Sequence, residues 1–203
     1  MDSIDSALDA LRAGKLILLV DDQDRENEGD LVMAAEKATP ESVNFMIQHG
    51  SGIVCVTLSI EQAKRLELPL MVPKKSSHSH FVAAFTHSIE AAHGVTTGVS
   101  AADRAQTIRI AANPNSRPAD LSRPGHVFPL IARAKGVLER PGHTEGSVDL
   151  MKLAGLAPSG VLCELINPDG TMSRMPEMKE FAKKHNLVIL SIQQLIEYRK
   201  ANE

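Results

Sequence analysis

The residues with the clearest capacity for chemistry lie in the stretch 21–30, DDQDRENEGD. Six of its ten residues are acids, and they are Asp21, Asp22, Asp24, Glu26, Glu28 and Asp30. A single cation, Arg25, lies among them. Like charges packed this closely repel one another and lower the stability of the folded chain. The folded protein therefore needs a partner for these carboxylates that offsets their mutual repulsion.

Three interpretations of the acidic stretch differ in what its carboxylates face. A solvated surface loop is the usual state of an acidic run, but this run directly follows the apolar segment 16–20, where α/β proteins place active-site loops. A calcium loop counted from Asp22 fails, because Asn27 and Met33 stand where the pattern needs Gly and Glu. The third interpretation is a Mg²⁺ or Mn²⁺ site for a phosphorylated substrate, with Arg25 as a fork of donors to phosphate.

A phosphate-binding segment is needed for the third interpretation, and the sequence Arg-Pro-Gly-His occurs twice, at 123–126 and 140–143. Thr144 follows the second copy and predicts the start of a helix, whose first N–H groups favour an anion. Arg140 and the Thr144 hydroxyl would add donors, and His143 could bind a metal ion as a neutral imidazole. A lone histidine is more often a surface or capping residue, but two copies after Pro-Gly favour a functional interpretation.

Two further residues have chemistry that their apolar surroundings make conspicuous. Glu164 lies inside the segment GVLCELI, where a carboxylate is costly unless it is paired or neutral. It is either an ion-paired or strand-end residue, or a general acid or base with a raised pKa. Cys55 lies in GIVCVTL and is either a small core residue or part of the lining of a site.

Apolar periodicity and capping signals predict the elements that must position these residues. Helices are expected at 3–13, 39–50, 59–66, 100–112, 144–155, 176–185 and 191–201. Strands are expected at 16–20, 52–58, 80–92, 126–132, 160–166 and 187–190, with a Pro-containing loop at 113–125. Interleaved helices and strands indicate an α/β or α+β fold, with a mixed sheet flanked by helices in one domain, 1–203.

Composition excludes several classes of protein. The 203 residues carry a net charge of -3, so no basic surface for nucleic acid or an anionic membrane is expected. With no Trp and one Tyr, a platform of aromatic side chains on which nucleic-acid bases stack is not expected either. The N-terminus is polar and acidic, and no apolar run approaches the ~20 residues that span a bilayer. Cys55 and Cys163 are far apart in the sequence, which is typical of reduced thiols in a cytoplasmic protein.

Six segments carry a resemblance that covers approximately residues 5–200. They are, in chain order, DDQDRENEGDLV, HGSGIVCV, IEAAHGVTTGVSAADRAQTI, RPGHVFPL, GHTEGSVDLMKLAG and GVLCEL. Together they resemble the 3,4-dihydroxy-2-butanone 4-phosphate (DHBP) synthase family of riboflavin biosynthesis, and they imply its fold. Because the sequence ends at Glu203, it resembles the stand-alone form and not the form fused to GTP cyclohydrolase II.

The resemblance implies a lyase that converts D-ribulose 5-phosphate to DHBP and formate. The implied route passes through a metal-stabilised enediolate, dehydration and skeletal rearrangement. Mg²⁺ or Mn²⁺ would serve as cofactor, with two ions per site, in a homodimer whose sites lie near the interface. A metal-dependent phosphohydrolase and a plain metal or sugar-phosphate binding module are the alternatives, and formate release separates the lyase from both.

The resemblance also implies roles for individual residues. The metal ligands are Glu26 and His143, and the catalytic residues are His126, Glu164, Glu28 and Cys55. The substrate contacts are Arg25, Glu26, Asp30, Thr97, Arg140, Pro141, Gly142, His143, Thr144 and Glu164. Around residues 78–93 the sequence departs from the family, so no function is assigned to His78, His80, His87 or His93. That segment is interpreted as either a substrate-covering loop or surface variation.

Overall fold

The computed structural model describes residues 1–72 and 83–202, and its centre is one mixed sheet of seven strands in the order β4-β5-β3-β6-β2-β1-β7. The strands are β1 (Ile17–Val20), β2 (Gly29–Ala34), β3 (Cys55–Leu58), β4 (Ile89–Ala91), β5 (Leu121–Ile131), β6 (Gly160–Glu164) and β7 (Val188–Ser191). β1 pairs with β7 in parallel, as β3 does with β5, and the other neighbours are antiparallel. The predicted mixed sheet flanked by helices is confirmed.

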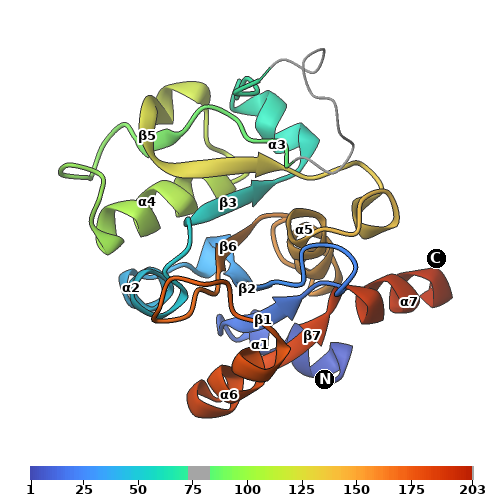
Figure 1. Cartoon of the computed structure of the whole chain (residues 1–203). Coiled ribbons are helices and arrows are strands. Elements are labelled where there is room, and N and C mark those ends of the chain that lie inside the picture. The colour runs from blue at the N-terminus through green and yellow to red at the C-terminus, as the bar shows by residue number, and fades with distance from the viewer. Residues whose placement is uncertain (73–82, 203) are drawn as a thin grey trace.

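Helices cover both faces of the sheet (Figure 1). They are α1 (Ile4–Arg12), α2 (Pro40–Phe45), α3 (Ile60–Arg65), α4 (Ala101–Ala112), α5 (His143–Leu153), α6 (Met175–His185) and α7 (Ile192–Asn202), with a π-helical turn, η2 (Met46–Gly50), after α2. The caps expected at Thr39, Ser59 and Ser100 form, and the hydroxyl of Ser100, for example, accepts the N–H of Asp103 at 3.0 Å. In the part of the chain that the structure describes, no helix has both the length and the apolar character needed to cross a membrane.

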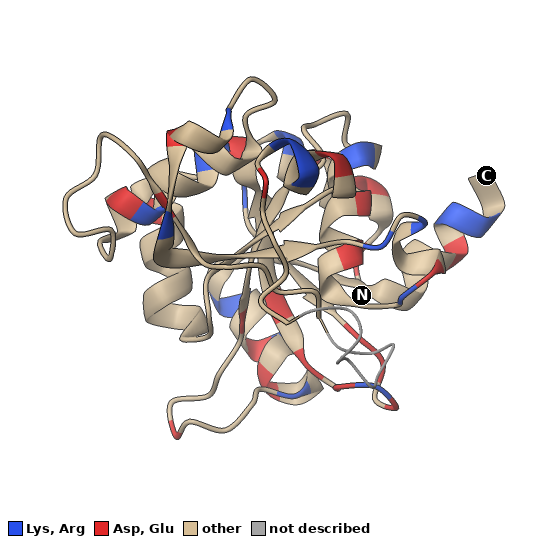
Figure 2. Ribbon diagram, turned by 90° about the horizontal axis from the view of Figure 1, so that it is seen from above, with Lys and Arg blue, Asp and Glu red and all other residues tan. Residues whose placement is uncertain are grey.

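The period of two along each strand divides the core into two layers. In β1, Leu18 and Val20 join a cluster packed against α2, α4 and α6. The alternate residues, Ile17 and Leu19, join a second cluster with residues of α1, α5 and α7. Burying a leucine contributes about 1.5–3 kcal/mol to stability, so both layers hold the sheet firmly. Charged residues lie mainly on the helices and loops around this apolar centre (Figure 2).

Strand β2 is the element that the sequence pattern did not reveal, and it has a direct bearing on the acidic stretch. All six of its residues are buried, and it pairs with β1 so that Leu19 lies opposite Asp30. Because its first two residues, Gly29 and Asp30, belong to the acidic stretch, the apolar pattern of the sequence does not show where β2 begins. The acidic stretch is therefore the connection of a β1–β2 hairpin that continues into a central strand.

Three other boundaries differ from expectation, and strand pairing explains the first of them. Residues 121–125 belong to β5, since Leu121 and Ser122 pair with β4. The strand expected at 80–92 is reduced to β4 among the described residues, and residues 80–82 lie outside them. Helix α5 begins one residue before Thr144, with Gly142 as its N-cap, so Thr144 is the second helical residue and not the cap.

Candidate active site

Asp21 organises the connection between β1 and β2, residues 21–28, which we call the acidic loop. Its buried carboxylate accepts the N–H of Glu28 on Oδ1 at 2.9 Å and the N–H of Glu26 on Oδ2 at 3.3 Å. The backbone closes the same turn, because the Asp21 N–H donates to the Glu28 carbonyl at 3.1 Å. Asn27 takes a left-handed conformation, φ 54°, that few residues other than glycine adopt as readily. One side chain thus fixes how the other acids are presented.

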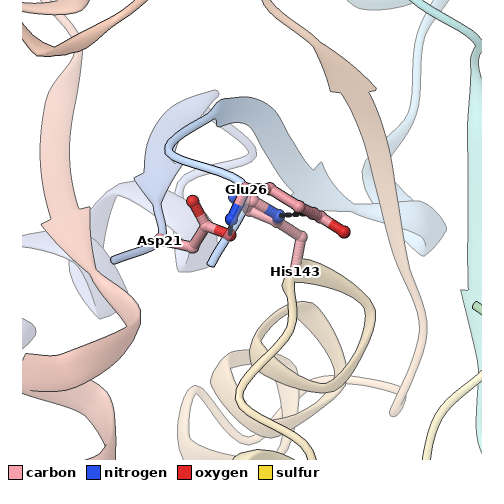
Figure 3. A group of neighbouring side chains, drawn as sticks. All are labelled: Asp21, Glu26 and His143. Carbon is pink, nitrogen blue, oxygen red and sulfur yellow. Dashed lines mark hydrogen bonds and ion pairs between the residues drawn. The ribbon is translucent and has the colours of Figure 1, made fainter. Parts of the chain in front are cut away.

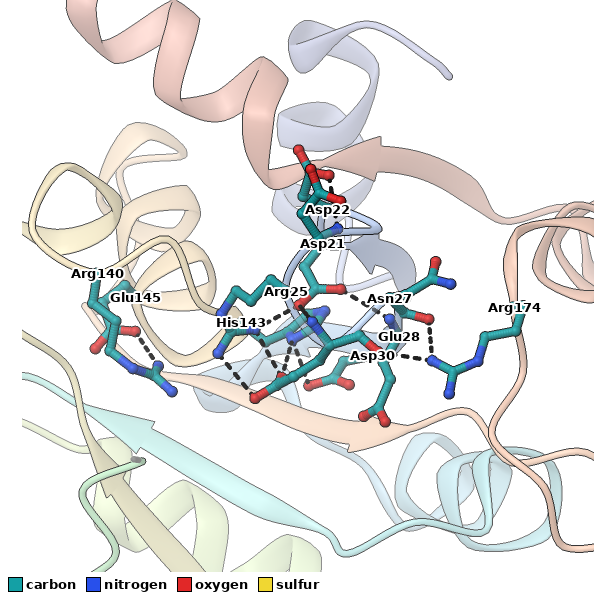
Figure 4. Close-up of polar contacts among 12 residues, drawn as sticks. Asp21, Asp22, Arg25, Asn27, Glu28, Asp30, Arg140, His143, Glu145 and Arg174 are labelled. Atoms are coloured by element: carbon teal, nitrogen blue, oxygen red, sulfur yellow. Dashed lines mark hydrogen bonds and ion pairs between the residues drawn. The ribbon is translucent and has the colours of Figure 1, made fainter. Parts of the chain in front are cut away.

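Arg25 is the counter-charge of the acidic loop (Figure 4). Its Nη1 lies 2.6 Å from Asp21 Oδ2 and 2.7 Å from Glu26 Oε2, and its Nη2 donates to Glu26 Oε1 at 3.1 Å. Only 12% of the Arg25 side chain is exposed, whereas 48% of the Glu26 side chain is. Charge-assisted bonds of this kind are roughly twice as strong as neutral ones, so they offset part of the repulsion.

His143, the first residue of α5, completes a group that could hold a metal ion. Asp21, Glu26 and His143 each offer one ligand atom, and these atoms lie within 4.8 Å of one another (Figure 3). His143 Nδ1 lies 3.9 Å from Glu26 Oε2 and 3.9 Å from Asp30 Oδ2. Burial lowers the pKa of His143, which favours the neutral imidazole that binds metal ions.

The Nε2 atom of His143 tests whether these residues fit a metal ion. It is buried and has no hydrogen-bond partner among residues 1–72 and 83–202. Leaving a buried polar atom unsatisfied costs about 1–3 kcal/mol, and a ligand would remove that cost. A neutral imidazole beside carboxylates is a suitable donor set for a divalent cation, so the residues fit the predicted group. Asp21 was not predicted as a ligand, although it is the first acid after β1.

Three further carboxylates, those of Glu28, Asp30 and Glu164, face the same space, and the environments of Glu28 and Asp30 raise their pKa values. Asp30 and Glu164 lie opposite each other on β2 and β6. Burial, followed by the charges of Glu164 and Glu26, raises the pKa of Asp30 well above its usual range. Burial and the charge of Glu26 also raise the pKa of Glu28. Carboxyl groups with raised pKa values in a cleft are candidates for general acids and bases.

The Glu164 carboxylate is held by the chain that leads into β3. Its Oε2 accepts the N–H of Ile53 at 2.7 Å. A Cβ atom at Gly52 would lie 2.4 Å from the same oxygen and 2.7 Å from the Glu164 backbone, so only glycine permits this approach. The sequence drew attention to Glu164, but the role of the Gly52–Ile53 backbone required the structure.

The start of α5 offers donors for an anion. Gly142, its N-cap, provides no side-chain cap, so backbone N–H groups of the first turn point outward with the positive end of the helix dipole. Arg140 lies beside this turn, and its Nη1 is 2.6 Å from Oε2 of the buried Glu145. A Cβ atom at Gly142 would lie 2.2 Å from that Nη1. The Arg140 guanidinium and the first turn of α5 therefore lie side by side, where both could contact one anion.

A cavity of about 220 Å³ brings these groups together. Eight residues assigned to the site on resemblance line it, and they are Arg25, Glu26, Glu28, Asp30, Arg140, His143, Thr144 and Glu164. Four apolar residues, Ala83, Phe85, Leu130 and Leu162, complete the lining. Residues distant in the sequence therefore converge on one polar cavity with an apolar wall.

Five of the assigned residues do not line this cavity, and two of them, Pro141 and Gly142, lie between Arg140 and the start of α5. Cys55 is fully buried, and burial followed by the charge of Glu164 raises the pKa of its thiol. Thr97 is exposed on the loop before α4. His126 is half exposed on β5, and its Nδ1 lies 2.7 Å from Glu90 Oε2. Their predicted roles stay predictions. His87 and His93 are exposed, and His78 and His80 lie outside the described residues.

Comparisons with known proteins agree on one family. The family model described as 3,4-dihydroxy-2-butanone 4-phosphate synthase matches residues 5–198. A 3,4-dihydroxy-2-butanone 4-phosphate synthase from Pectobacterium atrosepticum is 58% identical over 202 residues, which cover 100% of this chain and 92% of that protein.

Solved structures give the same result. RibBX, a two-domain 3,4-dihydroxy-2-butanone 4-phosphate synthase from A. baumannii, superposes with a TM-score of 0.95 at 48% identity, and the match covers 100% of this chain and 59% of that one. A 3,4-dihydroxy-2-butanone 4-phosphate synthase in complex with two magnesium ions superposes with a TM-score of 0.93 at 38% identity, covering 99% and 98%.

Proposed function

Because the chain belongs to the 3,4-dihydroxy-2-butanone 4-phosphate synthase family of riboflavin biosynthesis, we propose that it is a lyase acting on D-ribulose 5-phosphate. The products are DHBP and formate. The observation that carries the proposal is the cavity itself, which joins the acidic loop, the start of α5 and Glu164 around a space of about 220 Å³. A small phosphorylated sugar needs an anion site at one end and several acid and base groups at the other.

The phosphate end of the substrate binds at the start of α5. The outward N–H groups of the first turn, the Thr144 hydroxyl and the Arg140 guanidinium supply donors to one anion. Glu145 holds the Arg140 guanidinium at 2.6 Å, so the cation is oriented before substrate arrives. Preorganised donors of this kind cost little further ordering when the ligand binds.

The proton transfers take place among the carboxyl groups on the opposite wall. Enolisation, loss of water and skeletal rearrangement require protons to be removed and returned several times. Burial raises the pKa of Asp30 well above its usual range, which favours its protonated form, and the Glu164 carboxylate accepts the N–H of Ile53. The two carboxyls lie on paired residues of β2 and β6, so both reach one small sugar.

Glu26 and His143 would hold the metal ion, Mg²⁺ or Mn²⁺. Three observations on the described residues support this assignment, namely the partnerless Nε2 of His143, the lowered pKa of His143, and the 3.9 Å between His143 Nδ1 and Glu26 Oε2. A bound divalent cation would stabilise negative charge that develops on the sugar oxygens. Two ions per site are proposed by analogy with the relative that binds two magnesium ions.

We further propose a homodimer with sites near the interface. His126 and Thr97 are exposed and do not line the cavity, which supports a role at the site of a second copy. Residues 1–203 would form a single catalytic domain. The two buried free thiols, Cys55 and Cys163, support the expected cytoplasmic location, where thiols remain reduced.

The proposal is tested by measuring formate released from ribulose 5-phosphate, first with Mg²⁺ and then with EDTA. We expect one equivalent of formate per sugar with the metal ion and none without it. Glu26→Gln should abolish formate release while the far-UV circular dichroism stays that of the parent. Release of inorganic phosphate without formate would replace the proposal with a phosphohydrolase, and saturable binding without turnover would replace it with a binding module.

A further inference from the structure

Arg174, the N-cap of α6, contacts the acidic loop from outside the cavity. Its Nη1 donates to the backbone carbonyl of Glu26 at 2.8 Å and also to that of Asn27. These residues are separated by nearly 150 positions in the sequence, so the contact is a product of the fold. Figure 4 shows Arg174 approaching the loop from the side opposite Arg140 and His143.

The contact is complementary to the one that Asp21 makes. On the inner side, the Asp21 carboxylate accepts the N–H groups of Glu26 and Glu28, and the Asp22 carbonyl accepts the N–H of Asn27 at 3.2 Å. The carbonyls of Glu26 and Asn27 point the other way, toward Arg174. The peptide groups at the tip of the loop are thereby held from both sides.

Hydrogen bonds and packing hold the backbone around Arg174 in place. The N–H of Ser173, the residue before it, donates to the Leu165 carbonyl at 3.0 Å, and the Ser173 hydroxyl donates to Asn167 Oδ1 at 2.6 Å. One turn into α6, Met178 is buried against β2, where a Cβ atom at Gly29 would lie 2.2 Å from its sulfur. The backbone from which the Arg174 side chain extends is therefore held close to β2, the strand on which the acidic loop ends.

We infer that Arg174 is a positioning residue, which holds the Glu26–Asn27 peptide so that the Glu26 carboxylate faces His143. The inference rests on the proposed function in one respect, namely that Glu26 and His143 bind the metal ion. Asn27 has a left-handed φ of 54°, which costs energy in a residue other than glycine and persists only when its surroundings enforce it. The bonds from Arg174 to both carbonyls of this turn supply that constraint.

The chain offers a matched control in Arg12. This arginine is also exposed and also donates to two consecutive carbonyls, those of Leu153 and Ala154, at 3.4 and 3.2 Å. It lies on α1, and neither it nor its acceptors line the cavity. Arg12→Ala therefore removes the same kind of carbonyl contact, together with an exposed ion pair to Asp9, without affecting the acidic loop.

The test is the affinity for Mn²⁺ alone, measured by calorimetry or electron paramagnetic resonance on the full chain. Loss of a residue that orients a metal ligand typically costs 10–100-fold in affinity. We expect Arg174→Ala to raise the Kd for Mn²⁺ by about 10-fold or more, Arg174→Lys to give an intermediate value, and Arg12→Ala to match the parent. Melting temperatures of the two alanine variants should be similar, because both residues are exposed.

A Kd for Arg174→Ala within twofold of the parent, or an equal loss in Arg12→Ala, would overturn the inference. If Arg174→Ala does not fold, Arg174→Lys decides by the same criterion. Formate release by the parent is measured in parallel. A parent that binds Mn²⁺ but makes no formate would refute the proposed reaction and leave the role of Arg174 to be decided by the Mn²⁺ titrations.

Discussion

The two Arg-Pro-Gly-His segments of this chain, 123–126 and 140–143, have the same four residues but different surroundings. The first lies within β5, between Ser122, which pairs with Glu90, and Val127, which pairs with Ile89, so its four residues form a bulge in the sheet. The second leads into the N-terminus of α5. One histidine is half exposed beside Glu90, and the other is buried with a partnerless nitrogen among the described residues.

The difference shows that the tetrapeptide specifies no role by itself. The arginine of the first copy donates to the carbonyl of Leu66, whereas Arg140 faces the buried carboxylate of Glu145. Gly125 allows backbone to approach backbone at Ile89, whereas Gly142 leaves room for a guanidinium. The element to which each copy belongs or leads, strand β5 or helix α5, decides which of these contacts is available.

The largest expected difference between the copies comes from replacing each histidine by asparagine. Both variants should lose turnover. For His126→Asn the reason is loss of a proposed general acid or base, which costs about 10²–10⁴-fold, and for His143→Asn it is loss of a proposed metal ligand. Only His143→Asn should also lose the rise in melting temperature that Mg²⁺ gives the parent, because ligand binding stabilises the folded state by mass action. Thermal unfolding with and without Mg²⁺ measures this. An unchanged Mg²⁺ effect in His143→Asn would show that His143 is not a ligand.

Replacing the arginines should give the next largest difference, this time in stability. Arg140→Ala leaves the buried carboxylate of Glu145 without its ion pair and should cost about 3–5 kcal/mol. Arg123→Ala removes a hydrogen bond to one carbonyl and should cost about 1 kcal/mol. Urea unfolding measures both values. The double variant Arg140→Ala/Glu145→Ala should recover part of the loss, and additive losses would contradict the pairing.

Replacing the glycine of each copy by alanine should affect different properties, stability for Gly125 and substrate binding for Gly142. A Cβ atom at Gly125 would lie 2.0 Å from the Ile89 backbone, which cannot move aside, so Gly125→Ala should lower stability by about 1–3 kcal/mol. At Gly142 the obstacle is the Arg140 guanidinium, which can shift, so Gly142→Ala should mainly raise KM. Urea unfolding and steady-state kinetics distinguish the two. Equal destabilisation by both variants would refute the assigned environments.

The smallest expected effect concerns the carboxylates around the second copy when no metal ion is present. The folded pKa of Asp30 is raised above its unfolded value, so its contribution to stability is complete below the unfolded pKa and is lost as pH rises through the folded pKa. Asp30→Asn removes that loss. In EDTA the stability of the variant relative to that of the parent should be greater at pH 8 than at pH 5, by on the order of 1 kcal/mol. Urea unfolding at both pH values tests this, and a difference independent of pH would contradict it.

The sequence by itself determined the features that depend on local chemistry. Ser100 and Thr39 mark helix starts because their hydroxyls accept the N–H of the third helical residue, a contact within four consecutive residues. The apolar run that became β1 and the chain of acids after it are equally local. The motifs around Glu26, His143 and Glu164 were enough to place these residues in one family and to predict their shared cavity.

Only the tertiary structure decided which residues from other parts of the sequence contact each site residue. Strand β2 could be assigned only from its pairing with β1 and β6, because Gly29 and Asp30 interrupt the apolar pattern at its start. The contact of Arg174 with the acidic loop and that of Ile53 with Glu164 join residues more than 100 positions apart. Burial, hydrogen-bond partners and nearby charges set the protonation and orientation of a side chain, and these are properties of the packed molecule.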